Sequence, residues 1–362
     1  MQKITIQENY FTELEKEIVN FGELSATLFT YKTGVKAIKI KNAKGSATIL
    51  PYMGQMIWRA DFNGVELSMK TMYKDPVPVT GNYTGTYGCF LMHCGLTAMG
   101  NPTERDNHEP HGELPIAKYD NVYIITGTDE KGDYIEVTGT YNRKFCYETN
   151  YDFTPTVKLY KGGTSLFITA SFTNYKDIPL EYYYLCHINH KPVDGAKLLY
   201  TADRSTIKVN RCVPENYWDK AGGEATNKYL DRLMENPSLM DEVGLEGQAY
   251  SPEIVFSMKY TADENGKAYT MQLNPNGTAT YVIHNPSELP VGTRWISRTE
   301  DEDAMGMILP ATSEHLGRTY CREHGQQKYL KKGETITYSM ETGLLDEKGA
   351  KQMAEKIKSM GF

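Results

Sequence analysis

The sequence predicts an all-β protein, a large antiparallel β-sandwich. Segments such as VKAIKIKN (35–42) alternate apolar and polar residues, as half-buried strands do because successive side chains face opposite sides of a sheet. Such segments recur about every ten to twelve residues without intervening helices, which argues against a parallel α/β sheet. We therefore expect a single domain over residues 1–362 that consists almost entirely of strands.

Turn residues separate the expected strands. Asn63–Gly64 ends the alternation that begins at SATILPYMGQMIWRADF. Gly162–Gly163 joins two strong strand segments, since glycine readily adopts the positive φ of tight hairpin turns. The other expected strands are YIEVTGTYNRK, TPTVKLYK, SLFITASFTNY, STIKVN, EIVFSMKY, AYTMQL, ATYVIHN, AMGMILPA and TITYSMETG.

Helical periodicity is confined to three places. In residues 7–21, apolar side chains such as Phe11 and Ile18 fall on one helical face, which predicts an N-terminal helix. A short helix is expected at 228–236, and a polar one with a sparse apolar stripe at 345–361. These helices are expected to be peripheral to the sandwich.

Composition and charge exclude several classes of protein. The formal net charge is −7, and no run of basic residues exceeds the pair Lys331–Lys332, so a nucleic-acid partner is not expected. No stretch reaches the length of an apolar membrane span, and the N-terminus lacks the apolar segment of a secretion signal. The six cysteines form no CxxC pair, which favours reduced thiols in the cytoplasm.

The least strand-like segment is a long polar loop, 92–120. Long loops inside compact domains are uncommon and are often functional. This one contains NHEPHGELP (107–115), in which two histidines are three residues apart. Its hydrogen-bonding side chains are Asn101, Arg105, Asp106, His108, His111 and Glu113.

A second His-x-x-His spacing occurs in LCHINHKP (185–192), at the apolar end of an expected strand. Alternation places His187 and Asn189 on one face of that strand, and Ile188 and His190 on the other. Two polar side chains on one face of an apolar strand are costly to bury unless both are hydrogen-bonded. This pattern favours a functional site at the strand end.

Four segments together resemble a known family. They are CGLTAMGNP (94–102), HGELPIA (111–117), HINHKP (187–192) and RWISRTEDEDAMGMILPAT (294–312). In this order, they resemble the motifs of the aldose 1-epimerases, the galactose-mutarotase family, in a less characterised branch. The resemblance implies a galactose mutarotase-like β-sandwich that interconverts sugar anomers by acid/base ring opening, with a small carbohydrate as partner and no cofactor.

The resemblance also implies residue roles. His187 would be the acid at the ring oxygen, and His111 would be the second catalytic histidine. Histidine suits these roles because its ordinary pKa is close to neutral pH. It also implies that Asn189, Asp194 and Trp295 form pocket walls. Independently of the resemblance, we expect substrate-binding residues in the polar loop, at Asn101 and Arg105, and at the basic residues Lys191, Arg318 and Arg322.

The sequence departs from the family at its general base. The family has a glutamate in the stretch that reads GMILPAT here, so Leu309 stands where a carboxylate is expected. Glu323 is our first candidate for a substitute base, and Glu314 is the second. The basic residues Lys191, Arg318 and Arg322 also allow recognition of an anionic sugar.

Other functions stay open at this level. The two His-x-x-His pairs, with nearby carboxylates, are compatible with a metal-dependent sugar isomerase. Leu309 is compatible with a catalytically silent sugar-binding protein, and a related epimerase would use the same pocket. The sequence does not indicate the sugar or the oligomeric state.

Overall fold

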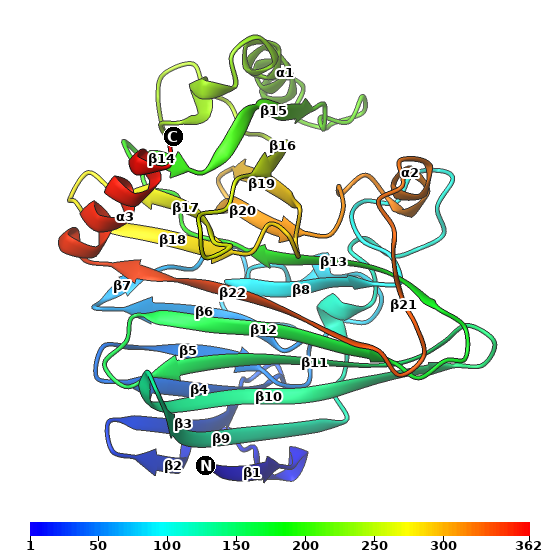
Figure 1. The fold of residues 1–362 in the computed structure, drawn as a ribbon, viewed down its shortest axis with the longest axis vertical. Helices are drawn as coiled ribbons and strands as arrows, with labels where there is room; N and C mark the ends of the chain where they lie inside the picture. Colours follow the sequence, from blue (N-terminus) through cyan, green and yellow to red (C-terminus); the bar gives the residue numbers. More distant parts are fainter.

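The computed structural model describes residues 1–362 and contains two antiparallel β-sheets packed against each other (Figure 1). The expected all-β sandwich is confirmed. The N-terminus lies at one end of the sandwich, and α1 and β15 lie at the opposite end (Figure 1). No helix is both long and apolar enough to cross a membrane.

The smaller sheet has nine strands. Its central hairpin pairs β11 with β12 through the predicted Gly162–Gly163 turn, in which Gly162 has a φ of +65°. In spatial order the strands are β1 (Gln2–Ile6), β9 (Asn121–Asp129), β10 (Gly132–Phe145), β11 (Thr149–Tyr160), β12 (Ser165–Asn174), β22 (Thr335–Leu345), β18 (Ala279–His284), β17 (Ala268–Leu273) and β14 (Lys197–Tyr200).

The larger sheet carries the candidate site on its outer face. In spatial order its strands are β15 (Ala202–Asn210), β16 (Ile254–Tyr260), β19 (Val291–Arg298), β20 (Asp303–Ala311), β13 (Leu180–Ile188), β8 (Leu91–Leu96), β6 (Met56–Phe62), β5 (Gly45–Leu50), β4 (Lys36–Asn42), β3 (Leu24–Thr30) and β2 (Lys16–Phe21). Two short strands pair at its margins: β7 (Val65–Glu66) with β6, and β21 (Lys328–Leu330) with β13.

The helices are short and peripheral (Figure 1). The α-helices are α1 (Lys220–Glu235), α2 (Arg318–Glu323) and α3 (Glu347–Ser359). The 3-10 helices are η1 (Glu8–Tyr10), η2 (Tyr83–Thr86), η3 (Leu114–Ile116) and η4 (Pro237–Met240). Asp219 and Asp346 cap α1 and α3 by accepting hydrogen bonds from backbone N–H groups of the first turn. Helices therefore form within both of the later segments predicted to be helical.

The N-terminal helix predicted at 7–21 is wrong. Only η1 is helical there, and Lys16–Phe21 is strand β2. Gly22, at a φ of +66°, makes a tight turn that lets β2 pair with β3 as a hairpin. Leu14, which the helical pattern placed on the buried face, is 81% exposed. Cross-strand pairing therefore overrides the helical spacing of these apolar residues.

The main hydrophobic core lies between the sheets, and β13 divides it from a second apolar cluster. Tyr184, Cys186 and Ile188 belong to the main cluster of 61 buried residues. Tyr183 and Leu185 belong to a separate cluster of 16 buried residues on the other face of the larger sheet. The alternation predicted for this strand is thus observed, and it directs His187 to the outer face.

Candidate functional site

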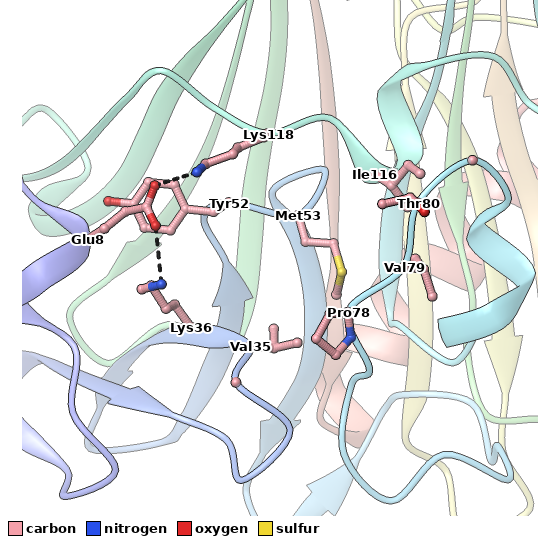
Figure 2. Close-up of a pocket in the computed structure, with 12 residues that line it drawn as sticks. Glu8, Val35, Lys36, Tyr52, Met53, Pro78, Val79, Thr80, Ile116 and Lys118 are labelled. Carbon is pink, nitrogen blue, oxygen red and sulfur yellow. Dashed lines mark hydrogen bonds and ion pairs between the residues drawn. The ribbon is translucent and has the colours of Figure 1, made fainter.

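A cavity of about 490 Å³ lies beside the N-terminal strands but offers no free acid–base pair (Figure 2). Its one carboxylate, Glu8, is ion-paired with Lys36 at 3.2 Å and Lys118 at 2.7 Å. Apolar side chains such as Met53 and Val79 form much of the remaining wall (Figure 2). No histidine lines it.

A second cavity, of about 210 Å³, is lined by three histidines and one glutamate. It lies on the outer face of β13, β16, β19 and β20. Residues of η2 and of the polar loop (92–120) complete its wall. Its lining residues are Tyr83, Thr84, Tyr87, Asn101, His111, Leu185, His187, Glu253, Val255, Thr293, Trp295, Leu309 and His315.

Four of the predicted site residues meet in this second cavity: Asn101, His111, His187 and Trp295. The rings of His111 and His187 are nearly perpendicular, with centroids 5.4 Å apart. The His187 ring also meets the indole of Trp295, with centroids 5.3 Å apart. Leu309, which the motif resemblance places where a carboxylate is expected, lines the same cavity and brings no carboxylate.

The backbone around His111 explains the His-Gly pair. The N–H of His111 donates to Gly100 at 2.9 Å, and its carbonyl accepts from Gly95 at 2.8 Å. His111 has a φ of +59° and Gly112 a φ of +76°. A Cβ at Gly112 would lie too close to the carbonyl oxygens of Gly95 and Ala98. Glycine at 112 thus permits the tight turn that brings His111 to the cavity.

His187 is oriented from behind by Asn189. Nδ1 of His187 lies 2.6 Å from Oδ1 of Asn189, and Nδ2 of Asn189 donates to the carbonyl of Cys89 at 3.0 Å. Asn189 has no exposed surface and does not line the cavity. The prediction that Asn189 forms a pocket wall is therefore wrong, because its side chain is fully buried and its amide bonds to His187 and to the backbone of Cys89.

The cavity has a carboxylate that sequence reasoning missed, Glu253. Nε1 of Trp295 donates to Oε2 of Glu253 at 2.6 Å, while Oε1 has no hydrogen-bond partner and is not fully buried. Glu253 directly precedes β16, whose Val255 pairs with Trp295 in β19. In the sequence, Glu253 reads as the polar first residue of an expected strand, so nothing in the local pattern marks it.

His315 is a third imidazole of the cavity. Its backbone carbonyl accepts a 2.9 Å hydrogen bond from the N–H of Asn101, which ties the loop after β20 to the polar loop. Sequence reasoning favoured Glu314, its neighbour, in this stretch. The turn beyond β20 instead directs the histidine to the cavity.

Neither predicted substitute for the missing base lines the cavity. Glu314 accepts from Ser257 at 2.9 Å and from Gln326 at 2.6 Å. Burial alone would raise the pKa of Glu314, but these hydrogen bonds lower it overall. Glu323 is exposed on α2 and makes a two-pronged contact with Arg105, at 2.6 and 3.1 Å. Both carboxylates already have protein partners outside the site.

The remaining predicted binding residues also lie outside the cavity, because they pair elsewhere or face solvent. Arg322 forms an ion pair with Glu181 at 2.7 Å, and Asp194 forms one with Arg298 at 2.6 Å. The predicted binding residues that lie outside the cavity in this way are Arg105, Lys191, Asp194, Arg318 and Arg322. The cavity lining contains no lysine or arginine.

The two His-x-x-His pairs do not form one cluster. His108 accepts a 3.4 Å hydrogen bond from the N–H of Arg318 outside the cavity. His190 is buried and lies 3.0 Å from the hydroxyl of Thr342 in the opposite sheet. No group of three or more His, Cys, Asp or Glu side chains is arranged to hold a metal ion.

Burial sets the protonation of the cavity. It lowers the pKa of His187 and of His315 to about 4, and that of His111 well below its usual value. It also raises the pKa of Glu253, an effect partly offset by the hydrogen bond from Trp295. The site therefore favours neutral imidazoles and disfavours an ionised carboxylate.

Comparison with solved structures identifies the fold. The solved structures that the chain resembles include a protein from Klebsiella pneumoniae that is provisionally assigned as an aldose 1-epimerase. It is 18% identical, with a TM-score of 0.81 over 99% of this chain and 95% of that one. A galactose mutarotase-like protein from Clostridium acetobutylicum gives 14% identity and a TM-score of 0.59, covering 90% and 100%. The chain therefore has the galactose mutarotase-like fold of these proteins, as the motifs predict.

The match to a sequence family is more specific than the likeness of fold. A family model described as "Domain of unknown function (DUF4432)" matches residues 32–344, so the chain belongs to the DUF4432 family. No curated protein matches the chain in sequence.

Proposed function

We propose that the protein is a carbohydrate-active isomerase that opens and recloses the ring of a monosaccharide and so interconverts its anomers. The observation that carries this proposal is Glu253, a carboxylate that lines the same cavity as His187 and is hydrogen-bonded to Trp295. It supplies the second acid–base group that Leu309 cannot. A protein that only bound sugar would need neither an unpaired carboxylate oxygen nor three imidazoles around one small cavity.

Ring opening needs two proton transfers. The anomeric hydroxyl loses a proton as its oxygen forms the carbonyl, and the ring oxygen gains one as the C1–O5 bond breaks. Rotation about C1–C2 then lets the ring close with the other anomeric configuration. In our proposal, Glu253 and His187 make these transfers, and the face of Trp295 supports the sugar ring.

The expected substrate is neutral and small. At about 210 Å³, the cavity is below the range of about 300–1,000 Å³ common for larger ligands, which favours a single sugar ring. Its lining has one carboxylate and no lysine or arginine to pair with a phosphate or uronate. Since Arg318 and Arg322 lie outside the cavity, the hypothesis that the protein recognises an anionic sugar loses these two proposed hydrogen-bond donors.

The reducing cytoplasm is the proposed setting. All six cysteines are free, and four of them are buried (Cys89, Cys94, Cys186 and Cys321). Buried free thiols are compatible with a compartment in which disulfides rarely form.

Anomer exchange tests the proposal directly. Saturation-transfer NMR on a panel of neutral aldoses should show exchange faster than in buffer. Glu253→Gln should lower the catalysed rate by about 10²–10⁴-fold with little change in KM. Glu323→Gln is the matched control, because Glu323 is exposed and outside the cavity. If no sugar that binds is exchanged faster than in buffer, the protein is a binder and the proposal fails.

A further inference from the structure

Hydrogen bonds around Asn189 set which ring nitrogen of His187 carries a proton. Nδ2 of Asn189 donates to the backbone carbonyl of Cys89 at 3.0 Å. A carbonyl oxygen only accepts, so the amide nitrogen must face Cys89 and the amide oxygen must face His187. That oxygen, Oδ1, is an acceptor, so Nδ1 of His187, 2.6 Å away, is the protonated nitrogen.

The other ring nitrogen, Nε2, therefore carries the lone pair whenever His187 is neutral. Nε2 has no hydrogen-bond partner in the protein and is not fully buried, and the ring lines the cavity. The hydroxyl of Tyr87 donates to the same Oδ1 at 3.3 Å, so a second donor reinforces its role as acceptor. Neutral His187 thus presents a proton acceptor to the cavity.

We propose that Asn189 is a positioning residue that holds His187 as the proton acceptor, so that His187 deprotonates the anomeric hydroxyl and the Glu253 carboxyl group protonates the ring oxygen. This inference rests on the proposed ring opening. It reverses the roles that the family resemblance implies, in which the histidine is the acid and a glutamate is the base.

The proposed step balances. The O1–H bond breaks, Nε2 of His187 takes the proton, and the released electron pair completes the C1=O1 double bond. The C1–O5 bond breaks with its pair on O5, which takes the proton of Glu253. His187 becomes an imidazolium and Glu253 a carboxylate, so the pair still holds one proton, and ring closure returns both groups to their starting states.

The surroundings of the pair support this direction of transfer. The titratable side chains around His187 are His111, His315 and Tyr87, and Glu253 lines the same cavity, hydrogen-bonded to Trp295. Burial lowers the pKa of His187 to about 4 and raises that of Glu253. A single proton shared by the two groups is therefore favoured on Glu253 over His187.

The tautomer of His187 can be measured without any substrate. In ¹⁵N-histidine-labelled protein at neutral pH, the ring of His187 should show a protonated Nδ1 and an unprotonated Nε2. Asn189→Leu should abolish this preference and lower anomer exchange by about 10²–10⁴-fold. Asn189→Asp keeps an acceptor, so it should retain the Nδ1–H tautomer. Its carboxylate should also raise the pKa of His187 in an NMR titration.

The outcomes separate the two proposals. A protonated Nε2, or an imidazolium, in the wild type at neutral pH overturns the acceptor role of His187. A merely structural Asn189 would destabilise the protein in both variants without moving the tautomer or the titration of His187. If the Nδ1–H tautomer is found but no bound sugar is exchanged, the proposed function fails, and the positioning role of Asn189 in catalysis fails with it.

Discussion

Nε1 of Trp295 donates a 2.6 Å hydrogen bond to the carboxylate of Glu253, although 42 residues separate them in the chain. The same indole meets the ring of His187, so one side chain contacts both groups of the proposed acid–base pair. The carboxylate comes from the residue before β16, on the opposite side of β19 from β20, which carries Leu309 at the position that the motif resemblance assigns to the base. A catalytic carboxylate is thus proposed to have changed strands within one sheet.

The Trp295 contact predicts a specific change in the pH dependence. Activity requires neutral His187 and protonated Glu253, so kcat/KM should fall below about pH 4 and again above the raised pKa of Glu253. Trp295→Phe removes the donor that lowers the pKa of Glu253, so that pKa should rise further. The alkaline limb of kcat/KM should then move to higher pH while the acid limb stays in place. Movement of both limbs together would contradict this assignment.

A carboxylate at the family's position should partly replace Glu253. In the inactive Glu253→Gln background, adding Leu309→Glu should raise anomer exchange at least about tenfold, because position 309 lines the same cavity. The buried carboxylate should also destabilise the fold, since burial disfavours its charged form. The double variant with Leu309→Gln is the control, and equal recovery in both would show that a titratable carboxyl group at position 309 is irrelevant.

Gly112→Ala should destabilise the protein by more than about 3 kcal/mol and displace His111. It combines a positive φ with a steric clash against the carbonyl oxygens of Gly95 and Ala98. Gly132→Ala is the matched control, since Gly132 also has a positive φ, +117°, but a Cβ there meets no atom within 4 Å. It should cost only about 1–3 kcal/mol. Urea unfolding midpoints would compare them, and equal losses would refute the packing argument.

Charged sugars should be excluded from the cavity. Aldose phosphates and uronates should exchange anomers no faster in the presence of the protein than in buffer, because the lining contains no lysine or arginine to pair with their charge. Their binding, measured by calorimetry, should be at least about tenfold weaker than that of the matching neutral aldose. Tighter binding of the phosphate would point instead to the arginines around α2.

The strands were predictable because alternation is a local property of the chain. The β13 pattern correctly placed His187 on one face and Ile188 on the other, and the His-Gly pair identified the loop that carries His111. Residues 7–21 misled because their apolar spacing fits a helix, whereas the Gly22 turn commits the segment to a hairpin. Only the pairing partner distinguishes these outcomes.

The carboxylate could not be predicted for a related reason. Glu253 becomes a site residue only when β16 pairs with β19, and no short-range pattern specifies that contact. Conversely, Arg105 and Glu323 looked like site residues because polar groups are dense in both segments. They bond to each other, 218 positions apart, and so leave the cavity to other side chains. Sequence shows which groups are present, but long-range pairing decides which of them remain free.

The two-faced character of β13 links the integrity of the fold to its chemistry. A slip of one residue along this strand would turn the imidazole of His187 into the space between the sheets and put a core side chain such as Cys186 in its place. The misregistered molecule would lose core packing and the reactive group at the same moment. A misregistered fold that is well packed but chemically inert is therefore hard to populate. Natural selection for activity would act at the same time as selection for correct folding.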